Sequence, residues 1–167
     1  MALTILTLLL VYQLKHFLAD FPLQRHWMLG KFKATGWVAP LAAHAGVHGG
    51  LSFLIVLAYS RSLFLAFLLA TFDFVVHFTM DRVKASPKLM GRWHALSAAE
   101  FRMAKMWVDG TTGVHDCGEA HGECSTKRAA DRLAIRGNTL FWWALGFDQM
   151  IHHVTHYIII YQLATIG

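Results

Sequence analysis

Ionisable residues spaced four apart recur in the apolar segments of this chain. One apolar run contains Asp73, His77 and Asp81. Residues four apart lie on one face of an α-helix, so these three side chains point in nearly the same direction. Two carboxylates and an imidazole on an apolar helix are unfavourable in lipid unless other groups partner them. We therefore expect the stretch 73–81 to be the centre of a polar site.

The same spacing supplies partners in the other apolar segments. Neutral imidazole and carboxylate groups are ligands for zinc, iron and manganese. The sequence thus predicts a metal centre, with zinc preferred over iron or manganese and with room for two ions. The predicted ligands are His16, Asp20, His44, His48, Asp73, His77, Asp81, Asp148, His152 and His156. Among them, the candidate catalytic carboxylates are Asp73, Asp81 and Asp148.

Four apolar segments must position these residues. The chain has 167 residues and is 56% hydrophobic, which favours one integral membrane domain over a soluble one. The expected spans cover residues 2–21, 40–59, 63–84 and 138–165. Pro22 ends the first span, because a helix interior does not tolerate proline. The predicted fold is an all-α, up-down four-helix bundle with helices 1–3 in residues 1–84 and helix 4 in residues 137–167.

The depths of the histidines in the membrane can be compared from the helix rise. At 1.5 Å per residue, one histidine from each span falls roughly 18–23 Å from the outer face. This predicted histidine layer contains His16, His48, His77 and His152. One turn nearer the cytoplasm we expect Asp20, His44, Asp81 and Asp148, and a third layer contains Asp73 and His156. His153 points about 100° away from His152 and is expected at the periphery.

The positive charges are concentrated in two connections. The net charge is +5, and most Lys and Arg residues lie in 22–39 and 85–136. The positive-inside rule therefore predicts a multi-pass protein of a bacterial inner membrane, with both connections in the cytoplasm and both termini outside. The metal site then lies toward the cytoplasmic side. No nucleic-acid motif accompanies the charge, so the expected partner is the lipid bilayer, with a homo-oligomer left open.

Residues 85–136 differ from the apolar segments. Within them, 91–109 has apolar and basic residues at near-helical spacing, which fits an amphipathic helix on the membrane surface or a helix packed on the ends of the bundle. The glycine-rich loop that follows offers a weaker second metal site or is a flexible polar loop. Its candidate ligands are His115, Cys117, His121 and Cys124. A cytoplasmic loop favours thiols or metal ligands over a disulfide.

Motifs in all four expected spans carry a resemblance to a known family. They occupy residues 15–24, 44–49, 73–81 and 141–153. On these motifs the chain resembles small bacterial and phage membrane proteins known only as a domain of unknown function. That resemblance implies no activity. In helix count and in its use of His and Asp, the chain is also similar to membrane-bound metal-dependent hydrolases.

The leading functional hypothesis is a membrane-embedded, metal-dependent hydrolase that acts on a lipid, a lipid-linked phosphate or another amphiphile. An alternative is a transporter or channel for divalent metal ions or protons, because such proteins line their pathways with Asp and His. A third hypothesis is an accessory membrane subunit in which a metal only holds the helices together. Haem binding is less consistent with the sequence, because it would leave the carboxylates without a role.

Overall fold

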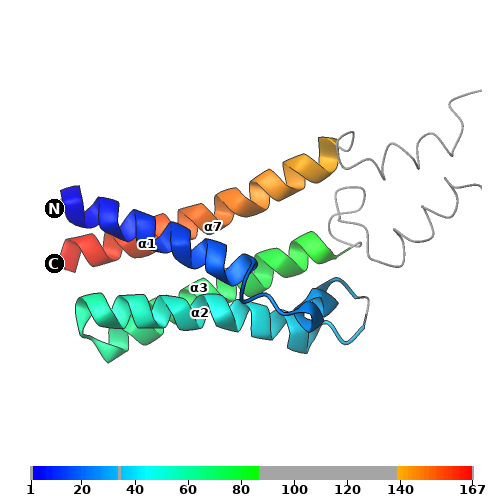
Figure 1. Cartoon of the computed structure of the whole chain (residues 1–167), viewed down its shortest axis with the longest axis horizontal. Helices are drawn as coiled ribbons and strands as arrows, with labels where there is room; N and C mark the ends of the chain where they lie inside the picture. Colours follow the sequence, from blue (N-terminus) through cyan, green and yellow to red (C-terminus); the bar gives the residue numbers. More distant parts are fainter. Residues whose placement is uncertain (1, 34, 87–138, 167) are drawn as a thin grey trace, which may run out of the picture.

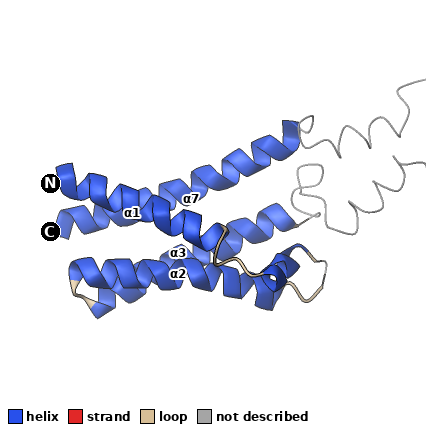
Figure 2. Cartoon of the chain, in the orientation of Figure 1, coloured by secondary structure: helices blue, strands red, loops and turns tan. Residues whose placement is uncertain are grey.

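The described part of the chain contains four long α-helices and one short 3₁₀ helix. The computed structural model describes residues 2–33, 35–86 and 139–166, and no strand occurs in these ranges. The elements in order are α1 (Ala2–Asp20), η1 (His26–Phe32), α2 (Val38–Ser60), α3 (Leu63–Ala85) and α7 (Thr139–Ile166) (Figure 2). The all-α prediction is confirmed. The 3₁₀ helix η1 lies in the connection between α1 and α2, where the sequence predicts no helix.

Local sequence signals account for where the helices end. Asp20 is the last residue of α1, and Pro22 follows shortly after it. Arg61 ends α2 in the left-handed conformation, with φ of 56°, and its backbone N–H donates to the Leu57 carbonyl. The Ser62 hydroxyl then accepts from the backbone N–H of Leu65 at 3.3 Å and caps α3. These signals produce a tight α2–α3 turn.

The helices run alternately up and down. Figure 1 places the N-terminus, the C-terminus and the α2–α3 turn at one end of the bundle. The end of α1, the end of α3 and the start of α7 lie toward the opposite end. We call the first of these the terminal end and the second the connection end. The predicted amphipathic segment 91–109 lies outside the described residues, as does the weaker metal site of His115, Cys117, His121 and Cys124.

Three of the helices are long and apolar enough to cross a membrane. They are α1, α2 and α3, which contain 19, 23 and 23 residues. This supports the prediction of a membrane protein. At 28 residues α7 is long enough to span, but it is not among the helices that also meet the hydropathy criterion. Asp148, Gln149 and three histidines between positions 152 and 156 lower its hydropathy.

An apolar core fills the bundle toward the terminal end. Each of the four long helices contributes fully buried aliphatic side chains to it. We call this cluster the terminal core. Its members are Leu8, Tyr12, Val56, Ala66, Leu69, Ile159, Ile160 and Leu163. In every long helix these residues lie on the terminal-end side of the predicted metal ligands, so the polar site is confined to the other part of the bundle.

Gly49 allows α2 and α3 to approach closely beside the site. A Cβ atom at Gly49 would lie 3.1 Å from the Ala70 carbonyl oxygen and 3.1 Å from the Phe74 Cβ, whereas a Cβ at Gly50 would meet nothing within 4 Å. We expect Gly50→Ala to stabilise the protein by about 0.5–1 kcal/mol, because alanine favours a helix interior. Gly49→Ala should instead destabilise it by about 1 kcal/mol through overpacking.

Thermal unfolding of both variants in detergent tests this pair. Each change adds one methyl group to neighbouring positions of α2, so Gly50→Ala is a matched control for Gly49→Ala. Equal shifts in the unfolding midpoint for the two variants would contradict the close approach of α2 and α3 at Gly49.

Candidate metal centre

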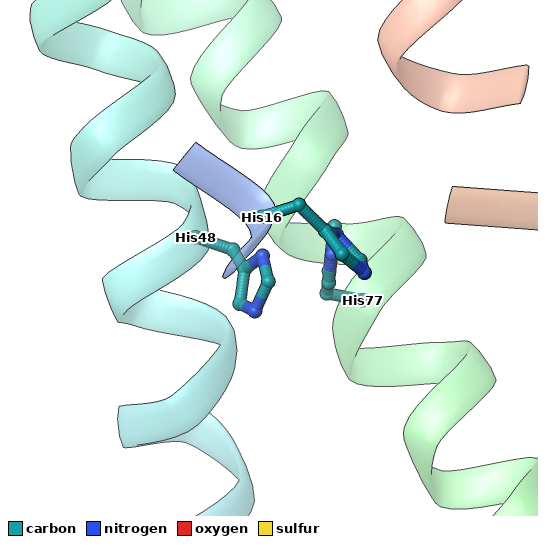
Figure 3. A group of neighbouring side chains, drawn as sticks. All are labelled: His16, His48 and His77. Atoms are coloured by element: carbon teal, nitrogen blue, oxygen red, sulfur yellow. The ribbon is translucent and has the colours of Figure 1, made fainter. Parts of the chain in front are cut away.

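The four histidines of the predicted layer meet inside the bundle. The His77 ring stacks on the His48 ring with centroids 3.8 Å apart and on the His152 ring at 4.0 Å. The His16 ring lies 5.6 Å from His48, 6.1 Å from His77 and 5.7 Å from His152. Figure 3 shows His16, His48 and His77 converging from α1, α2 and α3. The prediction that one histidine from each long helix lies at the same level of the bundle is therefore confirmed.

Asp20 is surrounded by imidazoles. Its Oδ1 lies 3.1 Å from His48 Nε2 and 3.5 Å from His44 Nε2, while its Oδ2 lies 3.1 Å from His16 Nε2. The His16 nitrogen also lies 3.0 Å from Gln149 Oε1. The Asp20 side chain is 23% exposed, whereas the His44 and His48 side chains are buried. One carboxylate at the edge of the site thus connects three imidazoles from α1 and α2.

Asp73 lies on the terminal-end side of the histidine layer and pairs with a lysine. Lys15 Nζ and Ser52 Oγ each donate to Asp73 Oδ2 at 2.6 Å. His77 Nδ1 is 3.2 Å from Asp73 Oδ1, and Lys15 Nζ also donates to His156 Nε2 at 3.2 Å. All five side chains are buried. The predicted layer of Asp73 and His156 therefore forms, with an ammonium group inside it.

Asp81 and Asp148 share a second lysine. Lys84 Nζ lies 2.7 Å from Asp148 Oδ2 and 3.2 Å from Asp81 Oδ1. Lys31 of η1 donates to Asp81 Oδ2 at 2.6 Å. His152 Nε2 is 3.3 Å from Asp148 Oδ1. Two ammonium groups thus neutralise two carboxylates at this level, where His44 Nε2 also lies 3.3 Å from Asp81.

More than half of the chain matches the model of a known family. The match is to a family described as "Protein of unknown function (DUF3307)" and covers residues 5–107. The chain belongs to the DUF3307 family. The resemblance drawn from the motifs is thereby confirmed, although the motif in residues 141–153 lies outside the matched range. No curated protein and no solved structure matches the chain.

The DUF3307 match includes Asp20, His44 and His48, which we call the Asp20 group. Asp20, His44 and His48 lie on α1 and α2, which fall within residues 5–107 except for the start of α1. Asp148, His152 and His156 come from α7, which lies beyond the match. The trio therefore needs no residue from outside the matched segment.

Sequence reasoning missed the three lysines that pair with carboxylates in this DUF3307 protein. In the sequence, Lys15 lies in the motif 15–24, Lys31 in the basic connection 22–39, and Lys84 at the end of the third expected span. The structure buries Lys15 and Lys31 and places Lys84 against two carboxylates. One signal could have revealed Lys15: a cation inside an apolar helix needs a buried anion nearby, and the same chain supplies several.

The lysines separate the possible metal-ligand groups into two kinds. Two groups, Asp73–His77–His156 and Asp81–Asp148–His152, have ligand atoms close enough to share an ion, but each contains a carboxylate paired with lysine. The groups Asp20–His44–His48 and His16–His48–His77 also have ligand atoms within 4.8 Å of one another, and their contacts in the described residues are with imidazole, carboxylate and amide groups. The lysine-free groups share His48.

The Asp20 group fits a zinc ion. Zinc bonds of 2.0–2.1 Å in a tetrahedron place neighbouring ligand atoms about 3.3 Å apart. The separations of His48 Nε2 and His44 Nε2 from Asp20 Oδ1 are 3.1 and 3.5 Å. Two imidazoles and one carboxylate leave a fourth position open, as in catalytic zinc sites. Buried His77 Nε2 has no hydrogen-bond partner among the described residues, so the adjoining group also retains an unused ligand atom.

Proposed function

We propose that this DUF3307 protein is a membrane-embedded, zinc-dependent hydrolase that acts on an amphiphile. The observation that carries the proposal is the trio of Asp20, His44 and His48. It combines two buried imidazoles with a part-exposed carboxylate at separations suited to zinc. A structural zinc is usually enclosed by four protein ligands, whereas three ligands with an accessible edge are typical of catalysis.

Electrostatics favours one ion over two. Asp73, Asp81 and Asp148 each have a lysine ammonium within 2.7 Å, whereas the ion-pair partners of Asp20 within the described residues are all histidines. Because the two lysine-free groups share His48, a second divalent ion would have to displace one of these ammonium groups from its carboxylate. The proposed primary ligands are therefore Asp20, His44 and His48. His16, which contacts the other oxygen of Asp20, holds that carboxylate in place.

The residues around the trio have separate proposed roles. A zinc ion bound there would supply Lewis acidity toward a substrate carbonyl or phosphoryl oxygen and toward water. Asp81 lies 3.3 Å from His44 Nε2, the nitrogen that would bind zinc, so its carboxylate would place negative charge beside the ion. Gln149 donates to Asp148 and contacts His16, so it links the trio to α7. The catalytic role expected for Asp73, Asp81 and Asp148 becomes a supporting one in this proposal.

The terminal core favours an enzyme over a transporter. A transport pathway needs polar groups through the whole thickness of the bundle. Here the ionisable residues occupy the connection side, and Leu8, Val56, Leu69 and Ile159 pack together beyond them. Fully buried aliphatic side chains at the terminal end would block an ion. A site that is open near Asp20 and closed at the other end suits a substrate that enters and leaves from one side.

We further propose that α7 is the fourth span and that both termini lie outside the cell membrane. The polar residues of α7 that line the site are buried, while Phe147, Val154 and Ile158 are exposed as lipid-facing residues would be. The connection end carries Lys31, Lys33, Arg82 and Lys84, which the positive-inside rule assigns to the cytoplasm. Zinc would then be bound in the cytoplasmic half of the bilayer.

Elemental analysis of the purified protein tests the metal, and lipid turnover tests the chemistry. We expect about one zinc per chain after purification without chelators, because the two lysine-free ligand groups share His48 and so compete for one ion. We expect the zinc-loaded protein to release hydrolysis products from a total bacterial lipid extract, measured by mass spectrometry, and to stop after zinc is removed. Zinc below about 0.2 per chain after reloading, or identical products with and without protein, would refute the proposal.

A further inference from the structure

A polar seam crosses the lipid-facing surface between α1 and α7. Gln13 lies within the apolar sequence of α1 and is exposed, and its amide nitrogen donates to His153 Nδ1 of α7 at 3.2 Å. Its neighbours Leu10 and Leu14 are exposed lipid-facing residues. An uncharged amide and a half-buried imidazole at such a position are costly in hydrocarbon. Their mutual hydrogen bond leaves the Gln13 carbonyl and His153 Nε2 without a partner among the described residues, so both atoms can serve a polar ligand.

The seam is continuous with the proposed zinc ligands of the Asp20 group. The His153 ring lies 5.6 Å from the His16 ring, and His16 contacts both Gln149 and Asp20. A line of polar groups therefore runs from Gln13 on the surface, past His153 and His16, to the part-exposed carboxylate of Asp20. The seam lies where α1, the first described helix, packs against α7, the last one (Figure 1).

The charges along this line indicate what it recognises. With His153 accepting from Gln13, the Gln13 carbonyl can accept and the second His153 nitrogen can donate. The nearby lysines are held by Asp73, Asp81 and Asp148 at 2.6–2.7 Å. Among the described residues, the seam thus offers hydrogen bonds and no unpaired lysine, which suits a neutral head group over a phosphate.

We propose that the seam of Gln13 and His153 is a lateral entrance for an amphiphile with an uncharged head group that contains hydroxyl, ester or amide groups. The head group enters from the bilayer between α1 and α7 and reaches Asp20 without crossing the membrane surface. This inference rests on the proposed hydrolase function and narrows its substrate class from amphiphiles in general to neutral lipids.

Photoaffinity labelling in vesicles tests the entrance. The full chain is reconstituted in phosphatidylcholine with a diazirine-bearing diacylglycerol or with phosphatidylglycerol that carries the same diazirine chain. Labelled peptides of α1 and α7 are quantified by mass spectrometry. We expect diacylglycerol to label them about tenfold more than phosphatidylglycerol, because the phosphate finds no cation along the seam and stays at the membrane surface, whereas the diacylglycerol head group gains one or two net hydrogen bonds. The variant Gln13→Leu/His153→Leu should label equally with both probes.

Two controls distinguish loss of the entrance from misfolding and from failure of the hydrolase proposal. Thr7→Val removes a polar group on α1 that bonds only to its own helix, at Leu3, and should retain the tenfold preference. Zinc content is measured for every variant and should stay near one per chain, which also reports folding. Equal labelling of the unaltered protein by both probes would overturn the inference, as would an unchanged preference in the double variant or cross-linked dimers joined through α1 and α7. Selective labelling without zinc would refute the hydrolase and leave the entrance supported.

Discussion

Asp20→Asn should abolish zinc binding, whereas Asp148→Asn should leave it intact. Asp20 contributes the anionic ligand of the trio and is contacted by His16, His44 and His48 within 3.5 Å. Its replacement by a neutral amide removes the charge that offsets a divalent ion. Loss of a group that only orients a ligand weakens metal affinity by about 10–100-fold. Loss of the carboxylate ligand itself should exceed about 100-fold.

Competition with a fluorescent zinc chelator measures both affinities. Asp148→Asn is the matched control, because it makes the same chemical change at a carboxylate whose partner is Lys84 at 2.7 Å. In that variant Lys84 retains Asp81 as its partner at 3.2 Å. An Asp20→Asn protein that binds zinc like the unaltered chain would place the metal elsewhere. Loss of zinc in Asp148→Asn alone would assign it to the Asp81–Asp148–His152 group instead.

The second large effect concerns the buried pair of Lys15 and Asp73. Lys15→Met would leave the Asp73 carboxylate fully buried without its ammonium partner, since Asp73 has an exposed fraction of 0%. Breaking one side of a buried ion pair costs about 3–5 kcal/mol. We therefore expect Lys15→Met to lower the free energy of unfolding by that amount. Adding Asp73→Asn should restore most of it, because the buried charge is then gone.

Unfolding in mixed micelles with increasing denaturing detergent measures the stability of the four proteins of this double-mutant cycle: the unaltered chain, the two single variants and the double variant. Lys33→Met is the control, because Lys33 is exposed and its removal should change stability by less than about 0.5 kcal/mol. A Lys15→Met protein as stable as the unaltered chain would show that the pair does not form. A double variant less stable than Lys15→Met would show that Asp73 has another essential partner, of which Ser52 and His77 are the nearest.

These two variants separate the roles of the aspartates. Asp20 is proposed to hold an ion, while Asp73, Asp81 and Asp148 hold lysines. Sequence alone gives no reason to divide them, because all four have a histidine four residues away. The division follows from which cation reaches each carboxylate. It reduces the expected metal count from two to one in the proposed function.

Helix positions and layers could be predicted from the sequence. Pro22, the Arg61 turn and the apolar runs mark where the long helices begin and end, and the structure agrees within a few residues. The histidine layer followed because an α-helix has a fixed rise per residue, so His16, His48, His77 and His152 share a depth once the span ends are known. The ends of a helix and the depths of its residues each depend on the sequence of that one segment.

Only the tertiary structure decided how those segments are turned toward one another. Lys15 meets Asp73, Lys31 meets Asp81 and Lys84 meets Asp148 across helices far apart in the sequence. Those pairings depend on the rotation of each helix about its axis and on the path of η1, which brings Lys31 into the bundle. A repeating spacing fixes the face that carries a residue but not the neighbour of that face. For this reason the sequence by itself determined a layered His and Asp site in a helical membrane protein. Side-chain packing decided that lysines pair with Asp73, Asp81 and Asp148, which is why we propose the lysine-free group of Asp20, His44 and His48 for the metal.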